Sequence, residues 1–209
     1  MFHLVHGIPH EPFAIAVSGG LDSMTFLKFL SLYKSNEFTV LHFNHGTEHG
    51  NEAERFVIRH CLDNGYELKV GRIKNERKRG QSLEEYWRNE RYAFFSEYKG
   101  KIITCHHLND VVETWLFTSL NGNPKLIPAE RGNFIRPFLA SRKEDIVSFY
   151  KRHGVTHIED PSNSEQEHAR NIIRHSLIPC ALKINPGIHT TIRNKIIDRY
   201  LLSKRGDVS

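Results

Sequence analysis

Short apolar runs alternate with longer amphipathic stretches over the first 120 residues of the chain. The apolar runs have the length of buried strands, and the longer stretches carry apolar residues at helical spacing. The predicted strands are Phe13–Val17, Phe38–Phe43, Tyr66–Ile73 and Lys101–Cys105. The predicted helices are Met24–Leu32, Asn51–Asn64, a helix opening at Ser82, and one from about Leu108 to Leu120. Strands that alternate with helices in this way predict a parallel, Rossmann-like α/β sheet with helices on both faces.

The pattern changes after Asn121, where turn residues become frequent. The segments predicted beyond this point are a short strand at Phe134–Phe138, helices at Ser141–His153 and Gln166–Ser176, and a basic helix at Ile188–Lys204. We therefore expect an α/β domain over residues 1–140 and a helical C-terminal extension over residues 141–209 that completes it.

Composition indicates a soluble globular protein. Hydrophobic residues make up 39% and charged residues 25% of the 209 positions. No apolar run reaches the roughly 18 residues that span a bilayer, and the N-terminus lacks the features of a signal peptide. The three cysteines lie far apart and form no CxxC pair. We expect a cytoplasmic protein without a membrane partner.

Positive charge is concentrated in two places. The formal net charge is +5. One cluster lies at residues 72–79 and the other at residues 193–205. Such clusters suit a polyanionic partner, first of all nucleic acid, although ordinary solubility would also explain them.

The strongest local signal is the hexapeptide Ser18-Gly19-Gly20-Leu21-Asp22-Ser23, which lies between a predicted strand and a predicted helix. Two glycines let a phosphate approach the backbone, and the following helix N-terminus favours an anion. The hydroxyls of Ser18 and Ser23 add donors, whereas the carboxylate of Asp22 suits a bridging cation. The alternative is a plain capped turn. The sequence contains neither a GxxxxGK[ST] nor a GxGxxG motif.

The hexapeptide resembles the SGGxDS signature of the N-type ATP pyrophosphatases, which have an adenine nucleotide alpha hydrolase-like fold. Members of that family include NAD synthetase, tRNA thiolases and tRNA(Ile)-lysidine synthetase. The resemblance implies that ATP is cleaved between its α- and β-phosphates and that AMP is transferred to a substrate oxygen. It implies ATP and Mg²⁺ as cofactors, and residues 1–140 as the nucleotide-binding domain.

Further segments resemble the tRNA(Ile)-lysidine synthetases. His42–Gly46 is similar to HxNHG, Cys105–Thr114 to AHHxDDQxET, and Arg136–Leu139 to RPLL. The helix with Glu85, Arg88, Arg91 and Tyr92 resembles ARxxRY, and Asp160–Asn163 followed by Arg170, Asn171 and Arg174 resembles DPSN…RNxxR. Three positions depart from the family: Trp87 replaces a small residue, Asn109 an aspartate and Val111 a glutamine.

The spacing of Asp110 and Glu113 lets both carboxylates point the same way from a helix start, and His106 precedes them. Such a group suits Mg²⁺, a lysine ammonium group or proton removal from an amine, whereas a zinc site lacks a familiar ligand spacing. A solvated helix face is the alternative reading for the acidic pair.

The expected catalytic residues are Asp22, His106, Asp110 and Glu113, with Asp22 and Asp110 as Mg²⁺ ligands. The expected nucleotide contacts are Ser18, Gly19, Gly20, Asp22, Ser23, His42, Asn44 and His45. The expected substrate or RNA contacts are Arg88, Arg91, Asp160, Ser162, Asn163, Arg170, Asn171 and Arg174. Loop or core histidines and surface ion pairs are the alternatives for the histidines and arginines.

The resemblance implies a ligase that adenylates the C2 oxygen of the wobble cytidine in tRNA(Ile) with a CAU anticodon and then joins L-lysine to C2. A homodimer is possible on the same grounds. Many family members carry additional C-terminal domains, so this chain resembles a short form. Two alternatives stay open: another tRNA-modifying enzyme on this scaffold, such as a thiolase, and a relative that binds tRNA or nucleotide without activity.

Overall fold

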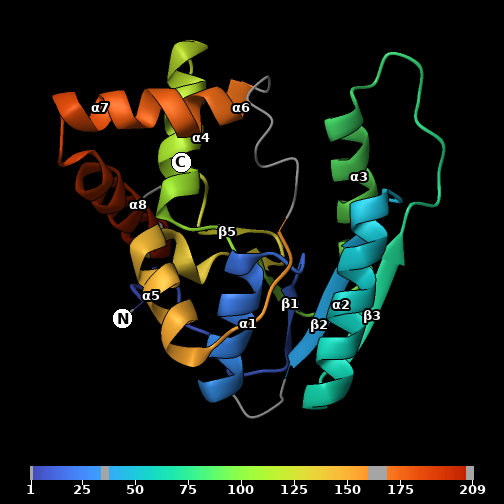
Figure 1. Cartoon of the computed structure of the whole chain (residues 1–209). Coiled ribbons are helices and arrows are strands. Elements are labelled where there is room, and N and C mark those ends of the chain that lie inside the picture. The colour runs from blue at the N-terminus through green and yellow to red at the C-terminus, as the bar shows by residue number, and fades with distance from the viewer. Residues whose placement is uncertain (1, 34–37, 160–168, 206–209) are drawn as a thin grey trace. The chain divides into compact units, whose positions relative to one another are not determined.

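The computed structural model describes residues 2–33, 38–159 and 169–205, and it divides into two compact units (Figure 1). We call Pro9–Cys105 with His153–Asp160 the sheet unit. The remainder, Met1–Ile8 with His106–Arg152 and Pro161–Ser209, is the helical unit. The domain boundary expected at residue 140 stays a prediction; within the helical unit, the helix after β4 packs with the C-terminal helices. Each unit is described by itself below.

The sheet unit is built on four parallel strands in the order β3-β2-β1-β4. Their bounds are β1 Phe13–Ala16, β2 Phe38–Asn44, β3 Glu67–Arg72 and β4 Lys101–Ile103. The chain moves outward from β1 to β3 and then returns to the other side of β1 to form β4. The order therefore reverses between β1 and β4, which is where open α/β sheets bind their ligands. The expected parallel, Rossmann-like fold is confirmed.

Three helices connect these strands: α1 Leu21–Tyr33, α2 Glu48–Asn64 and α3 Leu83–Ser96. Helices α2 and α3 both pack against β2 and β3 (Figure 1). Gly71 permits the close approach of α3, because a Cβ at this position would lie 2.4 Å from the ring of Phe94. The middles of the central strands are buried, with Ile15, Val40 and Ile102 all at 0% exposure. This rigid core fixes the loops at the carboxyl ends of the strands.

The helical unit is centred on α4, Leu108–Leu120. It also contains the antiparallel pair β5 Glu130–Arg131 and β6 Phe134–Ile135, the 3-10 turn η1 Pro137–Ala140, and α5 Lys143–His153. The C-terminal part comprises α6 Ala169–Ile172, the π-helical turn η3 Ile173–Leu177, α7 Ile178–Ile184 and α8 Ile188–Arg205. One apolar cluster joins α4, η1, η3, α7 and α8.

The structure corrects two expectations in the second half of the chain. The strand predicted at Phe134–Phe138 ends at Ile135, because Pro137 opens a 3-10 turn instead. The helix predicted to end at Ser176 continues to Ile184 through the π-turn, and the part expected before Ala169 lies outside the described residues. Among the helices that the structure describes, none has the length and apolar character that crossing a membrane requires.

Candidate functional site

The loop between β1 and α1 is closed by its own hydroxyls. The Ser23 Oγ donates to the carbonyl of Gly20 at 3.0 Å, so the proton shared between the Ser18 and Ser23 hydroxyls, 3.1 Å apart, comes from Ser18. Gly19 has a φ of 95°, which favours glycine, and its carbonyl accepts from the amide of Ile158 at 3.0 Å. The two hydroxyls therefore stabilise the turn, and the loop presents backbone amides at the start of α1, where the helix dipole attracts an anion. Asp22 lies in the first turn of that helix.

His42 connects β2 to this loop from within the sheet. Its Nδ1 donates to the carbonyl of Val17 at 2.8 Å, so Nδ1 carries the proton and Nε2 has a lone pair. The side chain is 2% exposed, and burial lowers its pKa. Nε2 is buried, with no hydrogen-bond partner among the described residues. His42 is thus a neutral, fixed acceptor, bonded to the residue that precedes Ser18. This arrangement is compatible with the expected nucleotide contact, and equally with a core histidine.

Asn44 is held by a buried polar network. Its Nδ2 donates to Asn51 Oδ1 at 2.9 Å and to Glu54 Oε2 at 2.7 Å, while its Oδ1 accepts from the amide of Gly46 at 2.7 Å. Glu54 is also paired with Arg72. Hydrogen bonds from Arg72 and Asn44 hold the pKa of Glu54 at about 2 against the cost of burial. The side chain of Asn44 therefore shapes the turn after β2, and we assign it that structural task.

An aromatic pair follows at the same end of β2. The ring of His45 lies 5.3 Å from that of Trp87 on α3. Burial, together with the positive charge of Arg91, lowers the pKa of His45 to about 4, so this imidazole is neutral at pH 7. The guanidinium groups of Arg88 and Arg91 lie 5.2 and 6.0 Å from the ring of Tyr92. The departure at position 87 thus places an indole beside the imidazole of a segment that resembles the family.

In the helical unit, Asp110 caps the start of α4. Its Oδ2 accepts the amide of His107 at 2.9 Å and lies 3.6 Å from the Nε2 of the same histidine. Its Oδ1 is 3.8 Å from Arg174 Nη2. The carboxylate of Asp110 is 24% exposed and so remains open to a ligand on one side.

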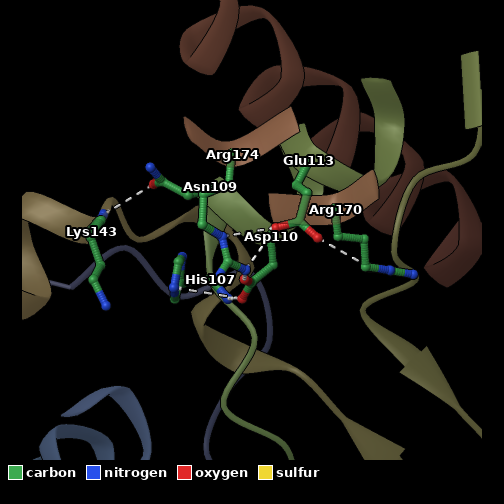
Figure 2. A network of polar contacts seen from close by, with 7 residues as sticks. All are labelled: His107, Asn109, Asp110, Glu113, Lys143, Arg170 and Arg174. Atoms are coloured by element: carbon green, nitrogen blue, oxygen red, sulfur yellow. Dashed lines mark hydrogen bonds and ion pairs between the residues drawn. The ribbon is translucent and has the colours of Figure 1, made fainter. Parts of the chain in front are cut away.

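Glu113, one turn further along α4, is enclosed by two arginines (Figure 2). Arg170 Nη1 donates to Oε1 at 3.2 Å, and Arg174 donates to Oε2 from Nη2 at 2.7 Å and from Nε at 3.1 Å. The side chain of Glu113 is 5% exposed, whereas each arginine is 45% exposed. Both oxygens of the buried carboxylate are therefore engaged, while nearly half of each arginine side chain stays accessible.

Two departures from the family pattern have structural explanations. Asn109 Oδ1 accepts the amide of Lys143 at 3.2 Å and so caps the start of α5 (Figure 2). An amide oxygen serves this purpose as well as a carboxylate does. Val111 is fully buried in the apolar cluster of the helical unit, where a side chain without polar atoms is favoured.

The expected site residues fall into two groups. The sheet unit contains the phosphate-loop residues Ser18 to Ser23, with His42, Asn44, His45, Arg88 and Arg91. The helical unit contains His106, Asp110, Glu113, Arg170, Asn171 and Arg174. Asp160, Ser162 and Asn163 lie outside the described residues. In the described part of the chain, no group of three or more acidic, histidine or cysteine side chains forms a metal-binding cluster.

Sequence reasoning missed Glu54 and Pro179, and it placed Arg72 in a basic cluster without its pairing to Glu54. Glu54 lies between Ala53 and Val57 on the buried side of α2, and a charged residue among apolar ones on a helix face was the available signal. Pro179 lies inside a continuous helical segment, where proline disturbs the hydrogen bonds of the preceding turn.

Comparison with known proteins agrees with these features. The model of the PP-loop domain family matches residues 2–181. The chain is 31% identical to a tRNA(Ile)-lysidine synthase of Thermotoga sp. (strain RQ2), over 92% of this chain and 50% of the relative. It is 33% identical to the Persephonella marina protein of the same name, over 93% of this chain and 48% of the relative. The chain thus spans about half the length of these relatives.

A solved U34-tRNA thiolase from Methanococcus maripaludis, described with its 4Fe-4S cluster, has a similar fold. The TM-score is 0.71 over 90% of this chain and 72% of that chain, at 15% identity. At this identity the likeness concerns the fold alone.

Proposed function

Because the chain belongs to the PP-loop domain family, we propose that it is the catalytic part of a tRNA(Ile)-lysidine synthetase. In this proposal it uses ATP to adenylate the C2 oxygen of a wobble cytidine and then joins L-lysine to C2. The observation that carries the proposal is the Ser18–Ser23 loop at the start of α1, together with relatives of that name over more than 90% of the chain.

The loop would bind the phosphates of ATP. The amides at the start of α1 are donors that suit an anion, and the hydroxyls of Ser18 and Ser23 hold the loop that presents them. The C2 oxygen attacks the α-phosphorus, the bond to the bridging oxygen breaks, and pyrophosphate leaves. Fixed donors lower the barrier because they are already oriented toward the charge that develops on the phosphate oxygens.

Lysine attacks in the second step. Its neutral ε-amine forms a bond to C2, loses a proton, and AMP leaves with the former C2 oxygen. A base is needed because an ammonium group has no lone pair. We assign this task to Asp110 or His106, since Asp110 keeps an exposed side while both oxygens of Glu113 are engaged by arginines.

The oxygens of Asp22 and Asp110 suit Mg²⁺, which prefers carboxylate and phosphate ligands. When bound, the ion neutralises negative charge on the nucleotide phosphates. Asp22 is in the first turn of α1, beside the proposed phosphate site, and we propose it as the principal Mg²⁺ ligand.

Arg88 and Arg91 on α3 and Arg170, Asn171 and Arg174 on the C-terminal helices are the proposed RNA contacts. Arg170 and Arg174 are each 45% exposed, so phosphate oxygens can reach their guanidinium groups. The proposed partners are therefore tRNA(Ile) with a CAU anticodon and L-lysine.

Incorporation of radiolabelled lysine into unmodified tRNA(Ile) with a CAU anticodon, with and without ATP, tests the proposal. We expect ATP-dependent labelling that Asp22→Ala reduces by about 1,000-fold, a loss of several kcal/mol of charge stabilisation. Asp63→Ala is the matched control, because Asp63 is an exposed acid on α2 that pairs with Arg59 on the same helix.

The alternatives predict different results. If tRNA is not labelled but pyrophosphate is released in a tRNA-dependent way, the chain adenylates tRNA and uses a nucleophile other than lysine. Neither labelling nor pyrophosphate release would indicate a binding protein. A thiolase is disfavoured because the three cysteines form no CxxC pair, and burial raises the pKa of Cys61 to about 11, which keeps that thiol protonated.

A further inference from the structure

The helical segment from Ala169 to Ile184 contains one widened turn. Residues Ile173–Leu177 are π-helical, and the amide of Ile178 donates to the carbonyl of Ile173, five residues earlier. Pro179 follows directly. Its ring has no N–H to donate and would clash with the carbonyl of His175 in a regular α-helix. The widened turn relieves this clash, so Pro179 explains where it occurs.

The widened turn also decides which side chains face inward. Ile173 and Ile178 are 4% and 7% exposed and both belong to the apolar cluster. Five residues apart, they would point about 140° from each other in a regular α-helix of 3.6 residues per turn. A turn with i to i+5 bonding brings such residues onto one face. Arg170 and Arg174 meanwhile both reach Glu113.

Removing the widened turn would rotate the residues before it against those after it by roughly 100°, the angle of one helical residue. Ile173 and Ile178 could then not both stay in the apolar cluster while Arg170 and Arg174 stay bonded to Glu113. Glu113 fixes the arginines from the other side, because each of its oxygens accepts from a different guanidinium (Figure 2).

We propose that Glu113 and Pro179 are positioning residues, which together hold Arg170 and Arg174 as a fixed pair of guanidinium groups. The pair faces an anionic substrate group with its exposed sides. Glu113 neither removes a proton nor binds a metal, because the two guanidinium groups occupy both of its oxygens. This inference rests on the proposed function for its effect on activity, but not for its structural part.

Two sets of variants test the inference. The first set is Glu113→Gln, Arg174→Ala and the double variant, and its control is Arg152→Ala, an exposed arginine on α5. The amide introduced by Glu113→Gln accepts from only one guanidinium, so we expect kcat for tRNA-dependent pyrophosphate release to fall by about 100-fold, as for a misplaced group. KM for ATP stays unchanged. Adding Glu113→Gln to Arg174→Ala lowers kcat by less than about a further twofold, because both substitutions disturb the same carboxylate–guanidinium group.

The second set separates orientation from charge. Pro179→Ala keeps every charge and permits a regular helix, so we expect lower kcat without a lower melting temperature. Its control is Pro124→Ala in the exposed turn after α4. Full activity of Pro179→Ala would overturn the part of the proposal that concerns this proline.

Three outcomes would contradict the assignment of Glu113. One is multiplicative losses in the Glu113→Gln, Arg174→Ala double variant. Another is loss of the acidic limb of the pH–rate profile in Glu113→Gln, since this is expected of a general base. The third is additive losses of melting temperature in the same cycle, which would show that the two residues do not interact. The last measurement needs no activity, so it decides the structural part even if the native chain fails to label tRNA.

Discussion

Two buried carboxylates, Glu54 in the sheet unit and Glu113 in the helical unit, are both neutralised by arginine, yet they have different tasks. Glu54 accepts from Arg72 on the adjacent strand and from Asn44, and so it holds the turn after β2. Asn44 and Arg72 are paired in the register of β2 and β3, which brings the arginine into place without any other help. Glu113 instead gathers two arginines that lie 57 and 61 residues further along the chain.

The exposed fractions explain the difference. The side chain of Arg72 is 69% exposed, and it contacts Glu54 from the end of β3, whose position the sheet already fixes. Arg170 belongs to α6, directly before the π-turn, and Arg174 lies in that turn, while the side chain of Glu113 that joins them is 5% exposed. Glu113 joins distant segments and fixes two arginines, whereas Glu54 on α2 bonds to the ends of two paired strands and fixes a loop.

The largest effect is expected when Glu113 loses both arginines. The Arg170→Met, Arg174→Met double variant leaves a buried carboxylate unpaired, which should reduce the free energy of unfolding at pH 7 by about 3–5 kcal/mol. Urea unfolding at pH 7 measures it, with Arg152→Met on the exposed side of α5 as the control.

The pH dependence of this variant gives a second check. Burial without a partner raises the pKa of a carboxyl group, so the folded variant takes up a proton that the unfolded chain takes up only at lower pH. Acidification from pH 7 to pH 5 should therefore reduce the deficit relative to the native chain. A deficit below about 1 kcal/mol at pH 7 would mean that Glu113 is not desolvated as described.

A smaller effect is expected in the sheet unit. Arg72→Met should cost less than about half as much at pH 7, because Glu54 keeps Asn44 as a partner and the lost guanidinium was largely exposed to screening solvent. Urea unfolding measures the cost, and Arg59→Met, which breaks an exposed pair on α2, is the matched control. If Arg72→Met reduced the free energy of unfolding as much as the Arg170→Met, Arg174→Met double variant does, the proposed difference between the two carboxylates would be wrong.

Acid should remove the contribution of Arg72. The pKa of Glu54 is about 2 in the folded chain against an ordinary value of 4.5, so the stabilisation is complete above pH 4.5 and is lost as the pH falls toward 2. Urea unfolding at pH 7, 4 and 3 should show the native chain and Arg72→Met converging. A constant difference over this range would mean that Glu54 has an ordinary pKa.

The sequence predicted the sheet well because its strands are continuous apolar runs and its helices carry apolar faces. It also located α4 at Leu108–Leu120 without error. It could not give the pairing of Glu113 with Arg170 and Arg174, because ion pairs between distant segments leave no periodic signal. The packing of α4 with α8 escaped prediction for a similar reason, because the two helices lie far apart in the chain.

Local chemistry also escaped prediction where proline was involved. Pro137 ended the strand predicted at Phe134–Phe138, and Pro179 produced a π-turn in a helix that was expected to stop at Ser176. In both places the apolar pattern continued, but the backbone hydrogen bonds could not. The nucleotide contact expected of Asn44 stays a prediction, but its residue type alone did not show that Asn51, Glu54 and Gly46 would be partners of its polar atoms.

The smallest effect is expected at Asn109, which lies beside Asp110 but outside the carboxylate–arginine pairs of Figure 2. Asn109→Ala removes the acceptor for the amide of Lys143 and should cost about 1 kcal/mol, the usual value of a helix cap. Asn109→Asp restores the acceptor that the family pattern has and should stay within about 0.5 kcal/mol of the native chain. Urea unfolding of the three proteins measures both values. A cost for Asn109→Asp equal to that of Asn109→Ala would show that a second charge beside Asp110 destabilises α4, and that the asparagine serves the neighbouring carboxylate as well as α5.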